Sequence, residues 1–174
     1  MGMMVTTFDS PLGLIRLCSD GRHLTAVTFA GQKHEENHIP KDAVSGSCPV
    51  LEEAKMWLTQ YFDGRISDSL PPVKPKGTAF QLGVWKLLLE IPYGETITYG
   101  ELARRLGCKS AQAVGGAVGK NPISLFIPCH RVIGQNGQLT GYAGGLSAKQ
   151  YLLELEQRNK NIFSLFPSVL KVSE

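Results

Sequence analysis

Residues 98–120, TYGELARRLGCKSAQAVGGAVGK, contain the signals that decide the fold. Thr98 followed three residues later by Glu101 is a capping box, which predicts that a helix carrying ELARRL begins there. Gly107 stands at the position where a left-handed residue commonly ends a helix. A short turn then leads to a further predicted helix over about 111–119. Two short helices joined in this way predict a helix-turn-helix, although the same shape is also ordinary core architecture.

Two more capping boxes lie on either side of this unit. Thr78 with Gln81 predicts the start of the helix FQLGVWKLLLEI, and Ser147 with Gln150 predicts the start of a last helix near the C-terminus. The second half of the chain is therefore expected to be helical.

The first half has the pattern of a small antiparallel sheet. The segments DSPLGLIRLCS (9–19) and HLTAVTFA (23–30) are short and β-rich, and the turn at 19–21 separates them. Apolar residues at helical spacing predict one helix over 50–62, packed on this sheet.

A Pro-rich segment, SDSLPPVKPKG at 67–77, separates the two halves. Its prolines fix φ and remove backbone donors, which predicts a stiff connection with a domain boundary near residue 76. The expected fold class is α+β, with a sheet domain and its helix over 1–76 and a helical domain over 77–174.

Composition excludes several classes of protein. The chain has 174 residues, of which 43% are hydrophobic and 19% charged, far from a disordered composition. No apolar run approaches the ~20 residues that cross a bilayer, and the N-terminus has no secretory signal pattern, so we expect a cytoplasmic protein without a membrane partner. Four cysteines form no CxxC pair, which argues against disulfides and a structural zinc site.

Positive charge is concentrated in the second half. Residues 1–79 hold 8 Lys/Arg and 9 Asp/Glu, whereas residues 80–160 hold 9 Lys/Arg and 5 Asp/Glu. An anionic partner is therefore expected to bind the second half.

The second helix of the helix-turn-helix, SAQAVGGAVGK, consists mostly of small residues. It lacks the long polar side chains that read the major groove, but it permits close backbone approach, which suits the minor groove of double-stranded DNA. The residues expected to contact DNA are Ala111, Gln112, Ala113 and Gly115 on the helix and Arg104, Arg105, Lys109 and Lys120 beside it. The basic residues among them are equally compatible with a solvated surface.

The segment IPCHRV, residues 127–132, places a cysteine, a histidine and an arginine in succession. A lone buried cysteine is usually just a small apolar side chain, but positive charge from Arg131 would favour the thiolate of Cys129. Neighbouring residues do not face each other on a helix, so His130 is expected to act on the thiol through a water. No matching Cys/His pair occurs elsewhere, so a zinc site is disfavoured.

These motifs together resemble the O6-alkylguanine-DNA alkyltransferases, also called methylated-DNA–protein-cysteine methyltransferases. The resemblance covers about 78–157, through TAFQLGVWKLLLEIPYGETITYGELA, AVGGAVGKNP, IPCHRV and GYAGGL, while 1–62 match more loosely. It implies a ribonuclease H-like N-terminal domain and a winged helix-turn-helix-like DNA-binding domain. It also implies that a monomer flips O6-alkylguanine, or O4-alkylthymine, out of DNA and transfers the alkyl group irreversibly to Cys129 without a cofactor or metal.

The resemblance assigns further roles. His130 is the water-mediated base and Glu156 completes the relay, while the Tyr99 hydroxyl donates to N3 of the base. Asn121 is expected to pin the turn before the cysteine, and the N–H of Ala143 to lie near O6. The carbonyls of Val132 and Cys129 are expected to accept from the exocyclic amine. The remaining expected site residues are Tyr142, Ser124 and Lys149 in the pocket and Arg131 as a DNA contact.

The sequence departs from the family pattern at two positions. Gln112 stands where relatives push an arginine into the space left by the flipped base, and Ser124 stands where some relatives have proline. Cys18 and His23 lack the partners of the zinc site that some relatives carry.

Two other functions would need sequence features that this chain lacks. A protein that binds the lesion without reacting would need another residue in place of Cys129. A helix-turn-helix transcription regulator would need polar reading residues over 111–119 and a dimerisation segment, and neither is visible.

Overall fold

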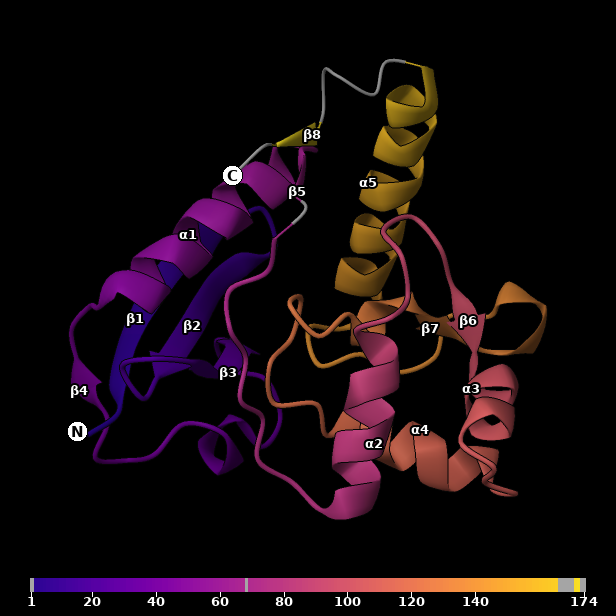
Figure 1. Ribbon diagram of the computed structural model, residues 1–174, viewed down its shortest axis with the longest axis horizontal. Coiled ribbons are helices and arrows are strands. Elements are labelled where there is room, and N and C mark those ends of the chain that lie inside the picture. Colours follow the sequence, from indigo (N-terminus) through magenta and orange to yellow (C-terminus); the bar gives the residue numbers. More distant parts are fainter. Residues whose placement is uncertain (1, 68, 166–170, 173–174) are drawn as a thin grey trace.

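The computed structural model describes residues 2–67, 69–165 and 171–172. Its N-terminal half is a four-stranded sheet with one long helix against it (Figure 1). The elements are β1 (Met4–Ser10), β2 (Gly13–Ser19), β3 (Leu24–Phe29), β4 (Val44–Ser45) and α1 (Pro49–Phe62). The strand order is β3-β2-β1-β4, antiparallel except that β4 runs parallel to β1.

The sequence pattern suggested one strand over residues 9–19, but the structure does not have a single strand there. It contains the end of β1, a tight turn at Pro11 and Leu12, and all of β2, so that Phe8 lies opposite Ile15 in a hairpin. The predicted turn after β2 is confirmed, and Gly21 adopts a φ of 99° that favours glycine.

Helix α1 lies where the apolar spacing predicted it. Pro49 occupies its first turn, where the missing N–H costs nothing. Its buried face follows the helical period toward the sheet and consists of Val50, Leu51, Ala54, Leu58 and Tyr61.

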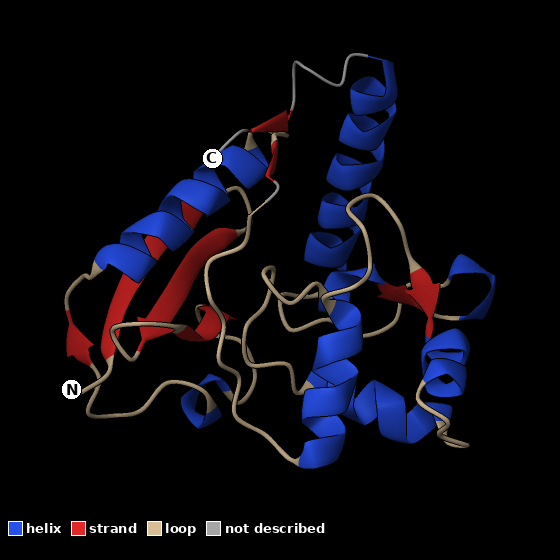
Figure 2. Cartoon of the chain, viewed as in Figure 1, coloured by secondary structure: helices blue, strands red, loops and turns tan. Residues whose placement is uncertain are grey.

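The C-terminal half is helical, with only small pairs of strands (Figure 2). Its helices and the strand pair β6–β7 are α2 (Ala79–Leu88), β6 (Ile97–Thr98), α3 (Tyr99–Arg105), α4 (Ala111–Gly119), β7 (Val132–Ile133) and α5 (Leu146–Leu165). The remaining short elements are the 3-10 turns η1 (Glu35–Asn37), η2 (Cys129–Arg131) and η3 (Gln135–Gly137) and the parallel pair β5 (Ile66–Ser67) and β8 (Lys171–Val172). The mixed α+β fold is as predicted.

The three predicted capping boxes have different outcomes. Thr78 and Gln81 form the complete reciprocal pair at α2. Thr98 accepts from the backbone N–H of Glu101, but the Glu101 carboxylate binds Arg104 and Arg105 instead of returning to the cap.

The prediction of the third capping box, at Ser147 and Gln150, is wrong. Helix α5 begins at Leu146, so Ser147 lies inside the first turn, and the Gln150 side chain donates to Glu154 at 3.0 Å. The sharp turn at Gly145, with a φ of 93°, precedes the helix in place of a serine cap.

The helix-turn-helix forms as predicted. Helix α4 occupies 111–119, and Ser110 caps it by accepting from the N–H of Ala113. Gly107 follows α3 with a φ of 66°, the left-handed conformation expected of a helix end.

The two halves are joined through β3. The Pro-rich segment runs along one end of this strand, where Leu24 bonds the backbone of Pro72 and Lys74. Val27 bonds Pro122 and Ser124, so the chain leading to Cys129 lies directly against the sheet.

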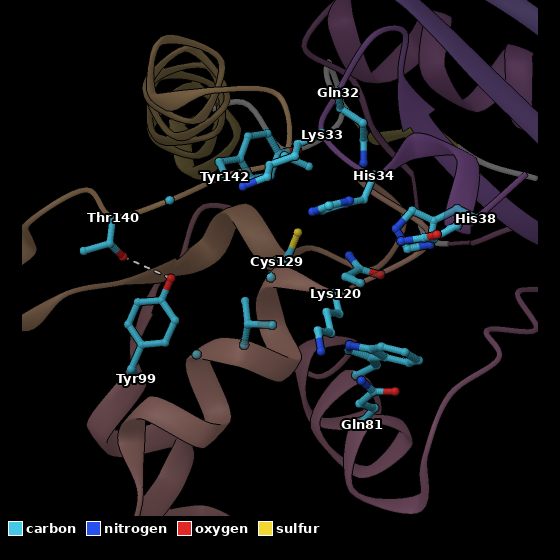
Figure 3. Close-up of a pocket in the computed structure, with 18 of the residues that line it drawn as sticks. Gln32, Lys33, His34, His38, Gln81, Tyr99, Lys120, Cys129, Thr140 and Tyr142 are labelled. Carbon is cyan, nitrogen blue, oxygen red and sulfur yellow. Dashed lines mark hydrogen bonds between the residues drawn. The ribbon is translucent and has the colours of Figure 1, made fainter.

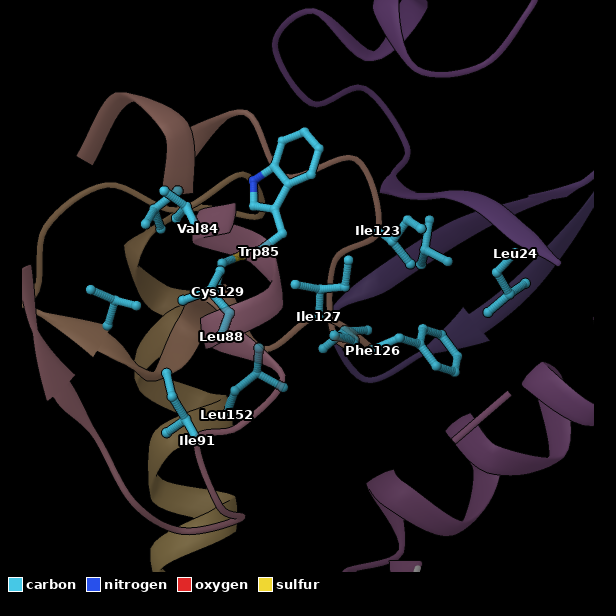
Figure 4. Close-up of a cluster of buried hydrophobic side chains, with 14 of the residues drawn as sticks. Leu24, Val84, Trp85, Leu88, Ile91, Ile123, Phe126, Ile127, Cys129 and Leu152 are labelled. Carbon is cyan, nitrogen blue, oxygen red and sulfur yellow. The ribbon is translucent and has the colours of Figure 1, made fainter. Parts of the chain in front are cut away.

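Apolar side chains from both halves form one core (Figure 4). Ile123, Phe126 and Ile127 lie between Leu24 of the sheet and the helical residues around Trp85. The Trp85 indole N–H donates to the carbonyl of Ala117 at 2.9 Å, which fixes α2 against α4. Within the described residues, no helix combines the length and apolar character needed to cross a membrane.

Candidate active site

Cys129 is the first residue of η2 and is 6% exposed. The turn that leads to it is held by Asn121, whose amide donates to the carbonyl of Ile127 at 2.9 Å and accepts from the N–H of Ile123 at 3.0 Å. The side chain of Asn121 is itself buried. The structure therefore places Asn121 where it fixes the backbone on both sides of the approach to the cysteine.

His130 lies fully buried beside the cysteine. Its Nε2 is 2.6 Å from a carboxylate oxygen of Glu156. Because an ionised carboxylate can only accept, Nε2 must carry the proton, and the lone pair of the neutral ring is on Nδ1. Nδ1 is buried and has no hydrogen-bond partner among the described residues, so the nitrogen that can act as a base is free.

Glu156 is a buried anion that accepts from several donors. Burial alone would raise the pKa of this carboxyl group, but His130 and Arg131 outweigh burial and hold its pKa far below the ordinary value. The partners are His130 Nε2 (2.6 Å), Tyr61 Oη (2.6 Å), Arg131 Nε (2.8 Å), Arg131 Nη2 (3.1 Å) and the N–H of Gly94 (3.0 Å). The carboxylate stays charged and fixes the orientation of the imidazole.

Tyr61 is a member of this network that the sequence did not reveal. It comes from α1 in the N-terminal half, and its hydroxyl is also 3.5 Å from His130 Nε2. In the sequence it stands three residues after Leu58 on an apolar helix face, which indicates only a core position. Gly94 was also missed, although the turn PYGE around it, where its φ is 80°, was a visible signal.

Arg131 does not have the two roles expected of it. It is only 9% exposed, and its guanidinium group binds Glu156 and the carbonyl of Ile91 at 2.7 Å. Its charge is thus neutralised inside the protein, where it is not available to a DNA phosphate. Arg131 is a structural partner of Glu156.

The expected influence of Arg131 on the thiol is also corrected. Burial raises the pKa of the Cys129 thiol, against the opposing influence of Asn121 and Lys149, and Arg131 does not contribute. Burial likewise lowers the pKa of His130, despite the attraction of Glu156. At neutral pH the site therefore rests as a thiol beside a neutral imidazole.

Tyr99 stands at the start of α3 with its hydroxyl accepting from Thr140 Oγ1 at 3.0 Å (Figure 3). Because the hydroxyl accepts there, its own hydrogen is free for another partner. Lys149 is buried, donates to the carbonyl of Thr140 at 2.9 Å and lies 5.9 Å from the centre of the Tyr99 ring. Lys149 thus holds the loop that carries Thr140 against Tyr99.

Tyr142 covers the histidine from the GYAGGL loop. Its ring meets His130 edge-on at 6.3 Å and Phe29 of β3 at 5.6 Å. A side chain at Gly144 would have its Cβ 2.9 Å from the Phe29 ring, so glycine allows the loop to approach the sheet. The Tyr142 hydroxyl is buried with no partner among the described residues.

A cavity of about 990 Å³ opens above Cys129. It brings together nine of the nineteen residues selected from the sequence: Cys129, Tyr99, Asn121, Tyr142, Ala143, Ala111, Gln112, Gly115 and Lys120. His130 and Glu156 are fully buried and do not line the cavity. The other selected residues that do not line the cavity are Val132, Ser124, Lys149, Ala113, Arg104, Arg105, Lys109 and Arg131.

Three of these residues have informative surroundings. Ser124 is buried, and its hydroxyl has no partner among the described residues. Arg104 and Arg105 remain on the surface, where Glu101 pairs with both. No cluster of His, Cys, Asp and Glu side chains in the described part of the chain has the arrangement of a metal site.

Comparison with known proteins gives consistent matches over both halves. Residues 79–158 match the family model of the 6-O-methylguanine DNA methyltransferase DNA binding domain, and residues 3–75 match that of its ribonuclease-like domain.

The relatives found include two bacterial proteins, each called methylated-DNA–protein-cysteine methyltransferase. The protein of Haemophilus influenzae is 46% identical, over 87% of this chain and 85% of its own length. That of Mycobacterium tuberculosis H37Rv is 44% identical, over 87% of this chain and 90% of its own. A crystal structure of the Mycobacterium tuberculosis protein OGT in complex with DNA matches with a TM-score of 0.82 and 41% identity, covering 90% of this chain and 94% of the other.

Proposed function

This chain belongs to the family of 6-O-methylguanine DNA methyltransferases, and from that premise we propose that Cys129 is the residue that accepts the alkyl group. The activity is DNA repair, in which an alkyl group on O6 of guanine is moved onto a cysteine of the protein. The observation that carries the choice of Cys129 is the free, buried Nδ1 of the adjacent His130, oriented by Glu156. A protein that only binds the lesion would have another residue in place of Cys129.

The chemistry is a displacement at the alkyl carbon. Cys129 Sγ forms a bond to this carbon while the bond from the carbon to O6 breaks, and the electron pair leaves with guanine. The thiol proton passes through a water to Nδ1 of His130, and Glu156 stabilises the resulting imidazolium. The Tyr99 hydroxyl donates a hydrogen bond to N3 of the leaving base and so stabilises the negative charge that develops on guanine, which then takes a proton from water.

The position of Cys129 requires the base to come to it. A thiol that is 6% exposed at the bottom of a cavity cannot reach O6 of a stacked base. The nucleotide must therefore leave the helix before it reacts. The small residues of α4, with Gln112 and Gly115 on the cavity wall, suit close approach to the minor groove by a monomer.

Intact-mass measurement tests the proposal. After incubation with excess duplex DNA containing O6-methylguanine, the protein should gain one methyl group per chain and no more, because a thioether has no route back to the thiol. Continued release of methyl groups beyond one equivalent, or a second modified site, would contradict a single-use acceptor. Unmodified duplex of the same sequence serves as the control.

Gln112 provides a second prediction, about base flipping. A glutamine can fill part of the gap and bond the unpaired cytosine, but it brings no charge. We expect Gln112→Ala to lose rate on duplex DNA but not on free O6-benzylguanine. Gln112→Arg should bind duplex more tightly, with a salt dependence steeper by about 0.9 for each phosphate that the arginine neutralises.

The three proteins are compared at sub-saturating DNA, with the free base as the control for chemistry. Equal duplex rates for wild type and both variants would mean that the side chain points only into solvent and does not support flipping.

A further inference from the structure

The cavity above Cys129 is larger than the part formed by the helical half. It continues to residues of the N-terminal half, on the loop around η1 and at the end of the Pro-rich segment. We call these residues the N-terminal lip: Gln32, Lys33, His34, Asn37, His38 and Lys76. In Figure 3, Lys33 and His34 lie on one side of Cys129, and Tyr99 and Lys120 lie on the other. The mouth of the cavity therefore has two sides, one from each half of the chain.

The charge around this mouth has one sign. The described residues that line the cavity include three lysines and two histidines, and no Asp or Glu is among them. Lys33, Lys76 and Lys120 are exposed, and none of the three forms an ion pair with another described residue. Arg104 and Arg105, by contrast, are both paired with Glu101.

The acidic residues of the same loop do not line the cavity above Cys129. Glu35 accepts from Arg16 at 2.8 Å, from the hydroxyl of Thr28 at 2.7 Å and from the N–H of Gly31 at 3.0 Å. Glu36 lines a neighbouring cavity, which shares Asn37, His38 and Lys76 with the lip, and it lies 4.0 Å from the ring nitrogen of His34. The unpaired charge of the lip is thus carried by its lysines.

Glu35 also anchors the lip. Arg16 belongs to β2 and Thr28 to β3, so three bonds tie the loop to the sheet. The anchoring outweighs a backbone cost at His34, which has a φ of 62° in the left-handed region. A loop fixed in this way presents Lys33 without the full ordering cost of a mobile loop.

We propose that the N-terminal lip binds phosphates of the DNA strand next to the flipped nucleotide, so that the N-terminal half is part of the DNA-binding surface. The inference rests on the proposed function. Gln112 and Gly115 of α4 line the same cavity as Lys33 and Lys76. A duplex seated on α4 that delivers a nucleotide to Cys129 therefore brings flanking phosphates to both sides of the mouth. The lip supplies cations on the side where the helical half has none.

The test compares two double variants with the same loss of charge. Lys33→Ala/Lys76→Ala removes both lip lysines, and Lys41→Ala/Lys55→Ala removes two lysines of the N-terminal half that do not line the cavity. Duplex binding is measured over a range of salt concentrations, and transfer is measured separately with free O6-benzylguanine. Thermal unfolding checks that both variants fold.

We expect the lip variant to bind duplex more weakly, with the slope of log K against log salt reduced by about 1.8, or 0.9 for each of two phosphates. The control variant should keep the wild-type slope, and both should react normally with the free base. The inference would be overturned if the lip variant had the same salt slope of duplex binding as the control variant. It would also be overturned if the lip variant lost rate on the free base to the same extent as it lost duplex binding. If wild type bound duplex but never became alkylated, the proposed function would fail while the slopes still tested the lip.

Discussion

Cys129→Ala is expected to abolish alkyl transfer completely while leaving duplex binding intact. The sulfur of Cys129 is the only protein atom in the proposed reaction that forms a bond to the alkyl group, so without it no slower route to alkyl transfer remains. The residues proposed to touch DNA lie on α4, α3 and the N-terminal lip, and none of them contacts the thiol through a hydrogen bond. The loss should therefore appear in the mass of the protein and not in its affinity.

Cys108→Ala is the matched control. Cys108 is a half-buried free cysteine near the DNA-binding helices, and the one described partner of its thiol is the carbonyl of Ser110. This variant should still gain one methyl group, and peptide mapping should place that group on Cys129. A methyl group found on Cys18, Cys48 or Cys108 in wild type would disprove the assignment.

Glu156→Gln should slow transfer by about 10²- to 10⁴-fold, the usual contribution of an acid–base group. A neutral amide cannot stabilise imidazolium as a carboxylate does, so the pKa of His130 should fall further below its ordinary value. Proton transfer from Cys129 then becomes harder, and the apparent pKa of the thiol should rise. The measurement is the rate of reaction with free O6-benzylguanine across pH.

The same change should lower the free energy of unfolding by about 3–5 kcal/mol, because it leaves the buried Arg131 without its counter-ion. Tyr61→Phe is the matched control, since it removes one donor to the carboxylate but keeps the charge. It should have a much smaller effect on both rate and pH profile. A Glu156→Gln protein with an unchanged pH profile would show that the carboxylate supports the fold and not the reaction.

The sequence predicted the parts of this protein that depend on local chemistry. Helix α4 and its boundaries, the glycine after α3 and the cap at Thr78 follow from residues within a few positions of each other. The cap at Ser147 failed because the turn at Gly145 starts α5 two residues earlier than the motif implied.

What the sequence could not predict depends on contacts between distant residues. Tyr61 and Glu156 are 95 positions apart, and nothing near either residue indicates the other. The resemblance placed Arg131 on DNA, but burial next to Glu156 decides its role. The N-terminal lip depends in the same way on Glu35 reaching back to β2 and β3.

The burial of Cys129 bears on how the protein survives until it meets a lesion. A single-use acceptor is wasted if hydrogen peroxide or a stray soluble electrophile reaches it first, and thiolates are far more vulnerable than thiols. Because the surroundings of Cys129 raise its pKa, the waiting protein keeps this sulfur protonated and almost closed off from solvent. Nucleophilic strength develops only when a base fills the cavity and the proton can leave through His130. The low reactivity of the resting thiol thus protects the only equivalent of repair capacity that each molecule carries.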